Sequence, residues 1–107
     1  MPDRYYTYGS YSFIWDEDKN KLNIKKHKID FETASLVFSD DLRIEFEDAK
    51  HSEDEPRYDT IGMVMDVFFV VYCDRGSEDD SRIRIISARY ATKEEINLYN
   101  DLREGRF

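Results

Sequence analysis

The stretch that decides the fold is VFFVVYC, residues 67–73. It is apolar on both faces that a strand would present, and it is far too short to span a membrane. A strand buried on both faces belongs in the middle of a sheet. We therefore expect residues 67–73 to form the central strand, around which the rest of the chain is built.

The segments around this run alternate between apolar and polar residues. The alternation covers residues 42–46, 61–65 and 83–86, and Asp66 marks a tight connection just before residues 67–73. A period of two is typical of half-buried strands. The pattern therefore predicts a curved antiparallel sheet of about four strands.

Capping residues indicate where helices begin. Asp16 is expected to cap a first helix that ends near His27, and Asp30 a second helix over residues 31–38. The T-x-x-E pattern at residues 92–95 predicts a capping box that opens a last helix. Two helices, a meander of strands and a third helix define an α+β fold, with the N-terminal helices packed on the sheet.

The chain length limits the number of domains, and the cysteine and histidine content indicates the class of protein. A chain of 107 residues suits one domain, expected over residues 13–107 and preceded by a tyrosine-rich extension over residues 1–12. The tyrosines of the extension could stack on bases, or they could plug the core. The single cysteine, Cys73, and two histidines suggest a cytoplasmic protein without a metal or a cofactor.

Charge is segregated along the chain. Its net value is −8, yet residues 19–28 hold five lysines and a histidine, and residues 82–93 hold three arginines and a lysine, without one acidic residue in either segment. Bulk acidity disfavours nucleic acid. Two basic islands in an acidic background instead predict one positive face if the fold brings them together.

Each of the two basic segments allows two interpretations. Lys19, Asn23, Lys26 and His27 share one side of the first helix, which suits either RNA binding or an ordinary solvated surface. Arg82 and Arg84 share one side of a strand, with Arg89 near its exit. Arginines so arranged suit either phosphate recognition or cross-strand ion pairs with residues 42–47 or 58–65.

Three blocks of residues, in order and with similar spacing, resemble the BrnT family, the toxins of BrnT/BrnA toxin–antitoxin pairs. The first runs from Phe13-Ile14-Trp15-Asp16 to Val37-Phe38, and the second is His51-Ser52-x-x-Glu55-x-Arg57-Tyr58 with Ile61-Gly62. The third joins Val70-Val71-Tyr72 and Arg75 to Arg84-Ile85-Ile86-Ser87-Ala88-Arg89, Ala91 and Glu95. The sequence departs from the family pattern at Cys73, in the longer acidic loop 76–81, and in residues 1–12.

The resemblance implies a RelE-like fold and a metal-independent endoribonuclease that inhibits translation and growth. It also implies neutralisation by a ribbon-helix-helix antitoxin of the BrnA type, with DNA bound only by the toxin–antitoxin complex. On this interpretation Arg57, Arg75 and Arg89 contact the phosphate, Arg75 and Arg89 stabilise its transition state, and Lys26 and His27 transfer protons.

The rival hypothesis is a degenerate toxin that binds an antitoxin-like partner without catalysis. DNA binding by this chain alone is disfavoured, because no helix carries the expected recognition residues and the total charge is acidic.

Overall fold

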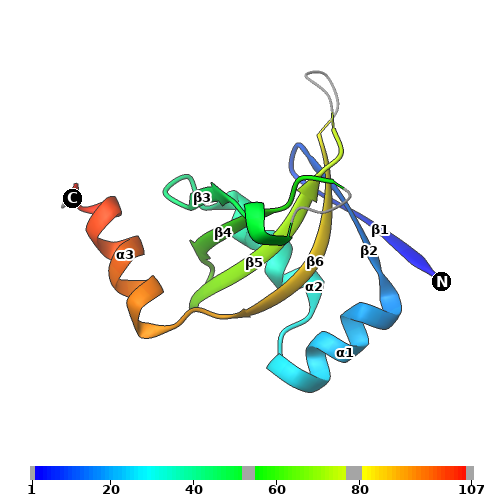
Figure 1. Ribbon diagram of the computed structural model, residues 1–107. Coiled ribbons are helices and arrows are strands. Elements are labelled where there is room, and N and C mark those ends of the chain that lie inside the picture. Colours follow the sequence, from blue (N-terminus) through cyan, green and yellow to red (C-terminus); the bar gives the residue numbers. More distant parts are fainter. Residues whose placement is uncertain (1, 52–54, 77–80, 106–107) are drawn as a thin grey trace.

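A mixed sheet forms the centre of the computed structural model, which describes residues 2–51, 55–76 and 81–105 (Figure 1). Its strands in that part of the chain are β1 (Asp3–Tyr8), β2 (Tyr11–Asp16), β3 (Ile44–Glu47), β4 (Tyr58–Met63), β5 (Val67–Asp74) and β6 (Arg82–Tyr90). They lie in the order β1-β2-β6-β5-β4-β3. The apolar run is an interior strand, as predicted, because β5 pairs with β4 on one side and with β6 on the other.

The expected number of about four strands, all antiparallel, is wrong. The described residues form six strands, and β2 runs parallel to β6, with Phe13 opposite Ile83. The two additional strands come from the first 16 residues, where β1 and β2 form an antiparallel hairpin. Phe13 and Trp15 in β2 are buried, and Tyr6 of β1 packs against both rings. The hairpin therefore extends the sheet because its aromatic residues help to complete the core.

The strand expected over residues 61–65 is displaced toward the N-terminus. β4 ends at Met63, and the Val64 amide donates to the Asp66 carbonyl at 3.0 Å. This bond closes the turn into β5, and Met65 at its tip is 97% exposed. The alternation at residues 61–65 therefore crosses from a strand into a turn.

The predicted helix starts are confirmed. Asp16 caps α1 (Glu17–His27), Asp30 caps α2 (Phe31–Ser35), and a complete Thr92–Glu95 capping box opens α3 (Lys93–Arg103). The second helix is shorter than expected, because the chain tightens into the 3₁₀ turn η1 (Leu36–Ser39). A second 3₁₀ turn, η2 (Ala49–His51), follows β3.

The two faces of the sheet are covered unequally. Phe31, Ala34, Val37 and Phe38 from α2 and η1 pack into the main core against β2, β5 and β6. In Figure 1, α2 passes behind β5 and β6, and α3 lies at the far end of the sheet from α1. We call the side that α2 and η1 leave uncovered the open face.

The open face is closed at one end by α3. Tyr99 of α3 is buried against Ile61 of β4 and Val67 of β5, with Phe69 and Ile96 packed beside them. Beyond this small cluster, most side chains that alternate away from the main core are at least partly exposed, whereas Asp59 and Cys73 among them are buried. Within residues 2–51, 55–76 and 81–105, no helix has the length and hydropathy needed to cross a membrane.

Candidate functional site

The open face carries a hollow of about 420 Å³, which we call the Arg89 hollow. Its lining includes Arg57, which immediately precedes β4. It also includes Asp59 of β4, Phe69 of β5, and Ser87 and Arg89 of β6. Asp59 is only 7% exposed, and its charge acts on the Arg89 guanidinium. The hollow thus combines positive charge with a buried acidic group.

The Arg89 side chain is held from two directions. Its guanidinium donates to both Glu95 oxygens, at 2.8 and 3.0 Å, and its carbon Cζ lies 4.0 Å from the centre of the Phe69 ring. The bonds to Glu95, together with the charge of Asp59, keep the Arg89 pKa above its ordinary value despite the opposing effect of burial. A fixed, charged guanidinium therefore borders the hollow, with both of its terminal nitrogens bound to Glu95.

A β-bulge in β6 brings the basic residues to one face. Strict alternation would place Arg84 and Arg89 on opposite faces, because five positions separate them. The structure pairs Val71 with Ser87 but Tyr72 with Ile85, so that Ile86 is an extra residue in the strand. The bulge re-aims the strand, and both arginines point to the open face.

Arg75 and Arg84 lie on the same face, farther toward β1. Arg75 donates to both oxygens of Glu55, at 2.5 and 3.2 Å, and Arg84 lies 3.5 Å from an Asp3 oxygen. The Arg75 bonds lower the Glu55 pKa, and the charge of Arg84 acts in the same direction. Arg84 thus pairs with Asp3 of β1 and Arg89 with Glu95 of α3, so neither of these ion pairs has the partner expected in residues 42–47 or 58–65.

The Cys73 side chain lies in the interior near these charged groups. It is buried in β5 opposite Arg84, and burial together with the nearby Glu55 carboxylate raises its pKa, while Arg57 and Arg75 act against this. The thiol is therefore protonated at neutral pH and belongs to the interior. The charges of Arg57 and Arg75 thus both act on this sulfur.

The structure gives Asn23 a structural position, which corrects its expected exposure on an RNA-binding surface. Its side chain is 6% exposed; it donates to the carbonyls of Ile29 and Ala88, at 3.0 and 2.8 Å, and accepts from the Ala88 amide at 3.2 Å. Asn20 makes a similar bond, accepting from the Phe31 amide at 2.9 Å. The poor helix propensity of asparagine was a usable signal, because such a residue needs a specific reason in a helix.

The other predicted residues of α1 lie at its surface. Lys19 and Lys26 are exposed and His27 is half-buried, and none of them lines the Arg89 hollow. His27 follows Asn23 by four residues and so shares its side of the helix. Because Asn23 binds Ala88, the residue before Arg89, His27 lies one helical turn from an attachment point on β6.

Several residues of this region were not among the predicted site residues. Asp59, Phe69 and Ser87 line the Arg89 hollow, and Glu95 orients its arginine. Glu95 was expected only as part of a helix cap, a role that it also fills by accepting from the Thr92 amide at 2.8 Å. Ser52 and most of the acidic loop 76–81 fall outside the described residues.

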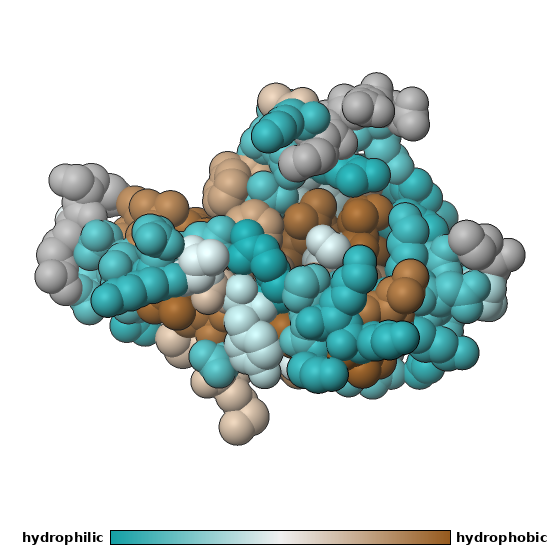
Figure 2. Space-filling model, turned by 60° about the horizontal axis from the view of Figure 1, so that its bottom comes forward, coloured by the Kyte–Doolittle hydropathy of each residue, from teal (hydrophilic) through white to brown (hydrophobic). Residues whose placement is uncertain are grey.

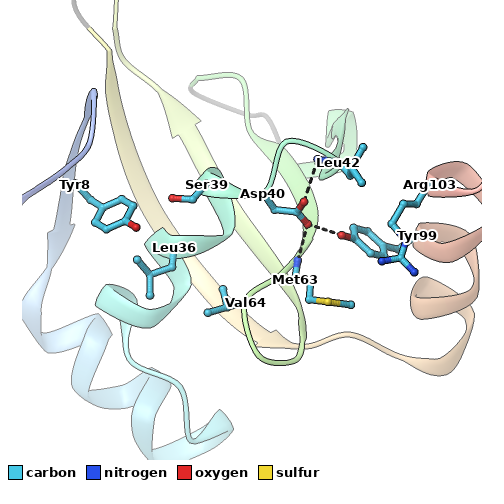
Figure 3. Close-up of a pocket in the computed structure, with 9 residues that line it drawn as sticks. All are labelled: Tyr8, Leu36, Ser39, Asp40, Leu42, Met63, Val64, Tyr99 and Arg103. Carbon is cyan, nitrogen blue, oxygen red and sulfur yellow. Dashed lines mark hydrogen bonds between the residues drawn. The ribbon is translucent and has the colours of Figure 1, made fainter.

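A separate hollow lies between η1, the β4–β5 turn and α3, as Figure 3 shows. Its centre is the Asp40 carboxylate, which accepts from the Tyr99 hydroxyl at 2.5 Å and from the amides of Met63 and Leu42, each at 2.9 Å. Burial alone would raise the Asp40 pKa, but these hydrogen bonds lower it below its ordinary value. We interpret this group as a tie between α3 and the sheet.

Apolar side chains are exposed in this hollow and on the turn and helix that border it. They are Leu42 at 54%, Met63 at 38%, Met65 at 97% and Leu98 at 45% exposure. Figure 2 shows hydrophobic surface between hydrophilic residues on the α3 side of the molecule. In the described ranges, no three His, Cys, Asp or Glu side chains lie close enough together to hold a metal ion.

Fold and site together define a class: a small α+β protein with an arginine-rich sheet face suited to bind phosphate groups. Comparison with known families makes this more specific. The family described as "Ribonuclease toxin, BrnT, of type II toxin-antitoxin system" matches residues 15–95, and the chain belongs to this family. No curated protein matches the chain.

Proposed function

We propose that this protein is the toxin of a type II toxin–antitoxin system and an endoribonuclease that cleaves RNA on the open face. The observation that carries the proposal is the convergence of Arg57 and Arg89 in one hollow, with Arg75 and Arg84 on the same face. Membership of a family of ribonuclease toxins supports it. The RelE-like character expected from the sequence remains part of the proposal.

The proposed reaction needs no metal. The ribose 2′-oxygen attacks the adjacent phosphorus, its proton passes to a base, and the bond from phosphorus to the 5′-oxygen breaks as that oxygen takes up a proton. The products are a 2′,3′-cyclic phosphate and a 5′-hydroxyl. Charge accumulates on the phosphoryl oxygens in the transition state, where fixed guanidinium groups have their largest effect.

We assign the arginines to stabilising this charge, and residues of α1 to proton transfer. Arg57 and Arg89 contact the scissile phosphate, and Arg75 contacts a phosphate next to it. Lys26 and His27 remain the proposed proton donors and acceptors, supported by the attachment of α1 to β6 beside Arg89. Lys19, Arg82 and Arg84 extend the contact with the RNA backbone.

The proposed partners follow from the same face. An antitoxin of the BrnA type would neutralise the toxin by covering the arginines, and DNA would be bound only by the toxin–antitoxin complex. Both the toxin and its RNA substrate would be cytoplasmic.

The chemistry can be tested on a defined single-stranded RNA. Purified protein should cleave it in the presence of a chelator and leave a 2′,3′-cyclic phosphate and a 5′-hydroxyl. A single 2′-deoxynucleotide at the cut position should block cleavage there, because the nucleophile is missing. Intact RNA, or equal cleavage of the deoxy-substituted strand, would contradict the proposal.

A non-catalytic interaction module is the second candidate. The exposed Leu42 and Met63, which line the hollow around Asp40, favour it, because an exposed apolar patch is typical of a protein-binding site. Overexpression distinguishes the two functions. A ribonuclease arrests growth, whereas a module leaves growth unchanged, and the comparison uses wild type against Arg89→Ala at matched protein levels.

A further inference from the structure

A third hollow, of about 390 Å³, lies where the N-terminal hairpin meets the basic face. We call it the Tyr5 hollow. Its lining includes Tyr5 and Thr7 of β1, Ser12 and Ile14 of β2, and the basic residues Arg75 and Arg82. It thus combines an aromatic ring, two hydroxyl groups and two guanidinium groups. No residue of β1 lies within the region that matches the toxin family, which begins at Trp15.

Two neighbouring tyrosines of β1 have different surroundings. Tyr6 points into the core, with its ring centre 6.4 Å from that of Phe13 and 5.9 Å from that of Trp15. Tyr5 points to the opposite face and is 76% exposed. Tyr6 therefore accounts for the packing of this strand, whereas packing does not explain the aromatic ring of Tyr5.

The Tyr5 hollow is continuous with the arginine face. Ser12 pairs with Arg82 and Ile14 with Arg84, which in turn pairs with Cys73. Asp3 of β1 lies 3.5 Å from Arg84. Arg75 belongs both to the lining of this hollow and to the group around Cys73 that Arg57 also reaches. An RNA strand that follows Arg89, Arg84 and Arg82 along β6 would therefore reach the Tyr5 hollow on the same side of the sheet.

Single-stranded RNA is recognised by aromatic rings that stack on its bases and by cations that follow its backbone. Both components are present here, at a size in the range of ordinary ligand pockets. Resting on the proposed ribonuclease function, we propose that the Tyr5 hollow is a subsite for a nucleotide flanking the cut. Its base stacks on Tyr5, and its phosphate contacts Arg75 and Arg82.

Binding to an RNA that cannot be cleaved tests this subsite apart from catalysis. The probe is a short, fluorescently labelled 2′-O-methyl oligonucleotide, titrated with wild type, Tyr5→Ala, Tyr5→Phe and Tyr8→Ala. Tyr8 is the matched control, because it is an exposed tyrosine of the same strand that points to the opposite side from Tyr5 and lines the separate hollow around Asp40 (Figure 3). We expect Tyr5→Ala to weaken binding by at least about fivefold, and Tyr5→Phe and Tyr8→Ala to bind like wild type.

Equal binding by wild type and Tyr5→Ala would overturn the proposal and leave the hollow to a protein partner. An equal loss in Tyr8→Ala would also overturn it, because the effect would then come from a general change in β1. Cleavage of all-ribose RNA is measured in parallel. If wild type cleaves RNA but binding does not depend on Tyr5, only the subsite fails. If Tyr5-dependent binding occurs without cleavage, the ribonuclease proposal fails instead.

Discussion

Two buried asparagines, Asn20 and Asn23, fix the position of α1. Apolar residues of this helix do not do so, since Leu22 and Ile24 are 55% and 41% exposed. Asn23 instead joins α1 to the edge of β6 through both the amide and the carbonyl of Ala88. The helix is thus attached beyond the end of β2, where the parallel pairing with β6 has ended.

Replacing Asn23 should lower the stability of the fold. We expect Asn23→Ala to lower the free energy of unfolding by about 2–4 kcal/mol, because it leaves buried backbone groups of Ile29 and Ala88 without partners. Urea denaturation measures the change. Asn97→Ala, on the exposed surface of α3, is the matched control and should be within about 0.5 kcal/mol of wild type. A similar small effect of Asn23→Ala would refute the structural role.

The Asp40–Tyr99 bond predicts a dependence of stability on acid pH. The Asp40 pKa is lowered in the folded protein, so its contribution is present above the ordinary value of 3.8 and is lost as the pH falls through the folded pKa. Tyr99→Phe should lower stability by about 1.5–3 kcal/mol at pH 7. The difference between wild type and variant should shrink below about pH 4. A difference that stays constant from pH 7 to pH 2.5 would contradict this assignment.

The same hydrogen bond also makes the stability of the fold depend on pH in the alkaline range. Burial and the hydrogen bond to Asp40 raise the Tyr99 pKa to about 12, so the protonated hydroxyl is the form that the fold favours. Its contribution is present below the ordinary value of 10.0 and is lost as the pH rises toward 12.

Among the elements, the close approach of η1 to β4 depends on Gly62. A Cβ atom there would lie 2.5 Å from Cγ1 of Val37, which is buried in the main core. Gly62→Ala should therefore destabilise the fold by about 1–3 kcal/mol through overpacking. The added methyl group can be accommodated if Val37 is shortened.

A double-mutant cycle checks this packing. Gly62→Ala combined with Val37→Ala should be more stable than the sum of the two single effects predicts, because the second change removes the clash. Strict additivity of the two free energies would show that η1 and β4 do not meet at these positions.

Local signals explain which elements the sequence predicts well. Capping residues identified all three helix starts, because a cap is a contact between residues two or three positions apart. The parallel pairing of β2 with β6 was missed, since it joins residues about 70 positions apart and leaves no local pattern. The bulge at Ile86 was missed for a similar reason, as it is set by the register with β5.

At the scale of the whole molecule, one face carries the basic strand residues of an acidic protein. The net charge of −8 suggests repulsion of nucleic acid, but the arginines of β6 are joined on the open face by Arg57 and Arg75. That these arginines act together on RNA stays a prediction from the sequence, and the bulge that aligns Arg84 with Arg89 was not predictable. Lys19 and Lys26 of α1 lie outside the lining of the Arg89 hollow, and the attachment of α1 to β6 beside that hollow depends on Asn23.

The most direct test of the central claim, that RNA is cleaved on the open face, is a comparison of single-turnover cleavage rates. The proteins are wild type, Arg57→Ala, Arg89→Ala and Arg4→Ala, each checked for folding by circular dichroism. Arg4 is the matched control, because it binds Glu32 on the side of the sheet that α2 covers. We predict that Arg57→Ala and Arg89→Ala slow cleavage by at least about 100-fold, while Arg4→Ala remains within about twofold of wild type. Wild-type rates in the folded Arg57→Ala and Arg89→Ala proteins, or an equal loss in Arg4→Ala, would contradict it.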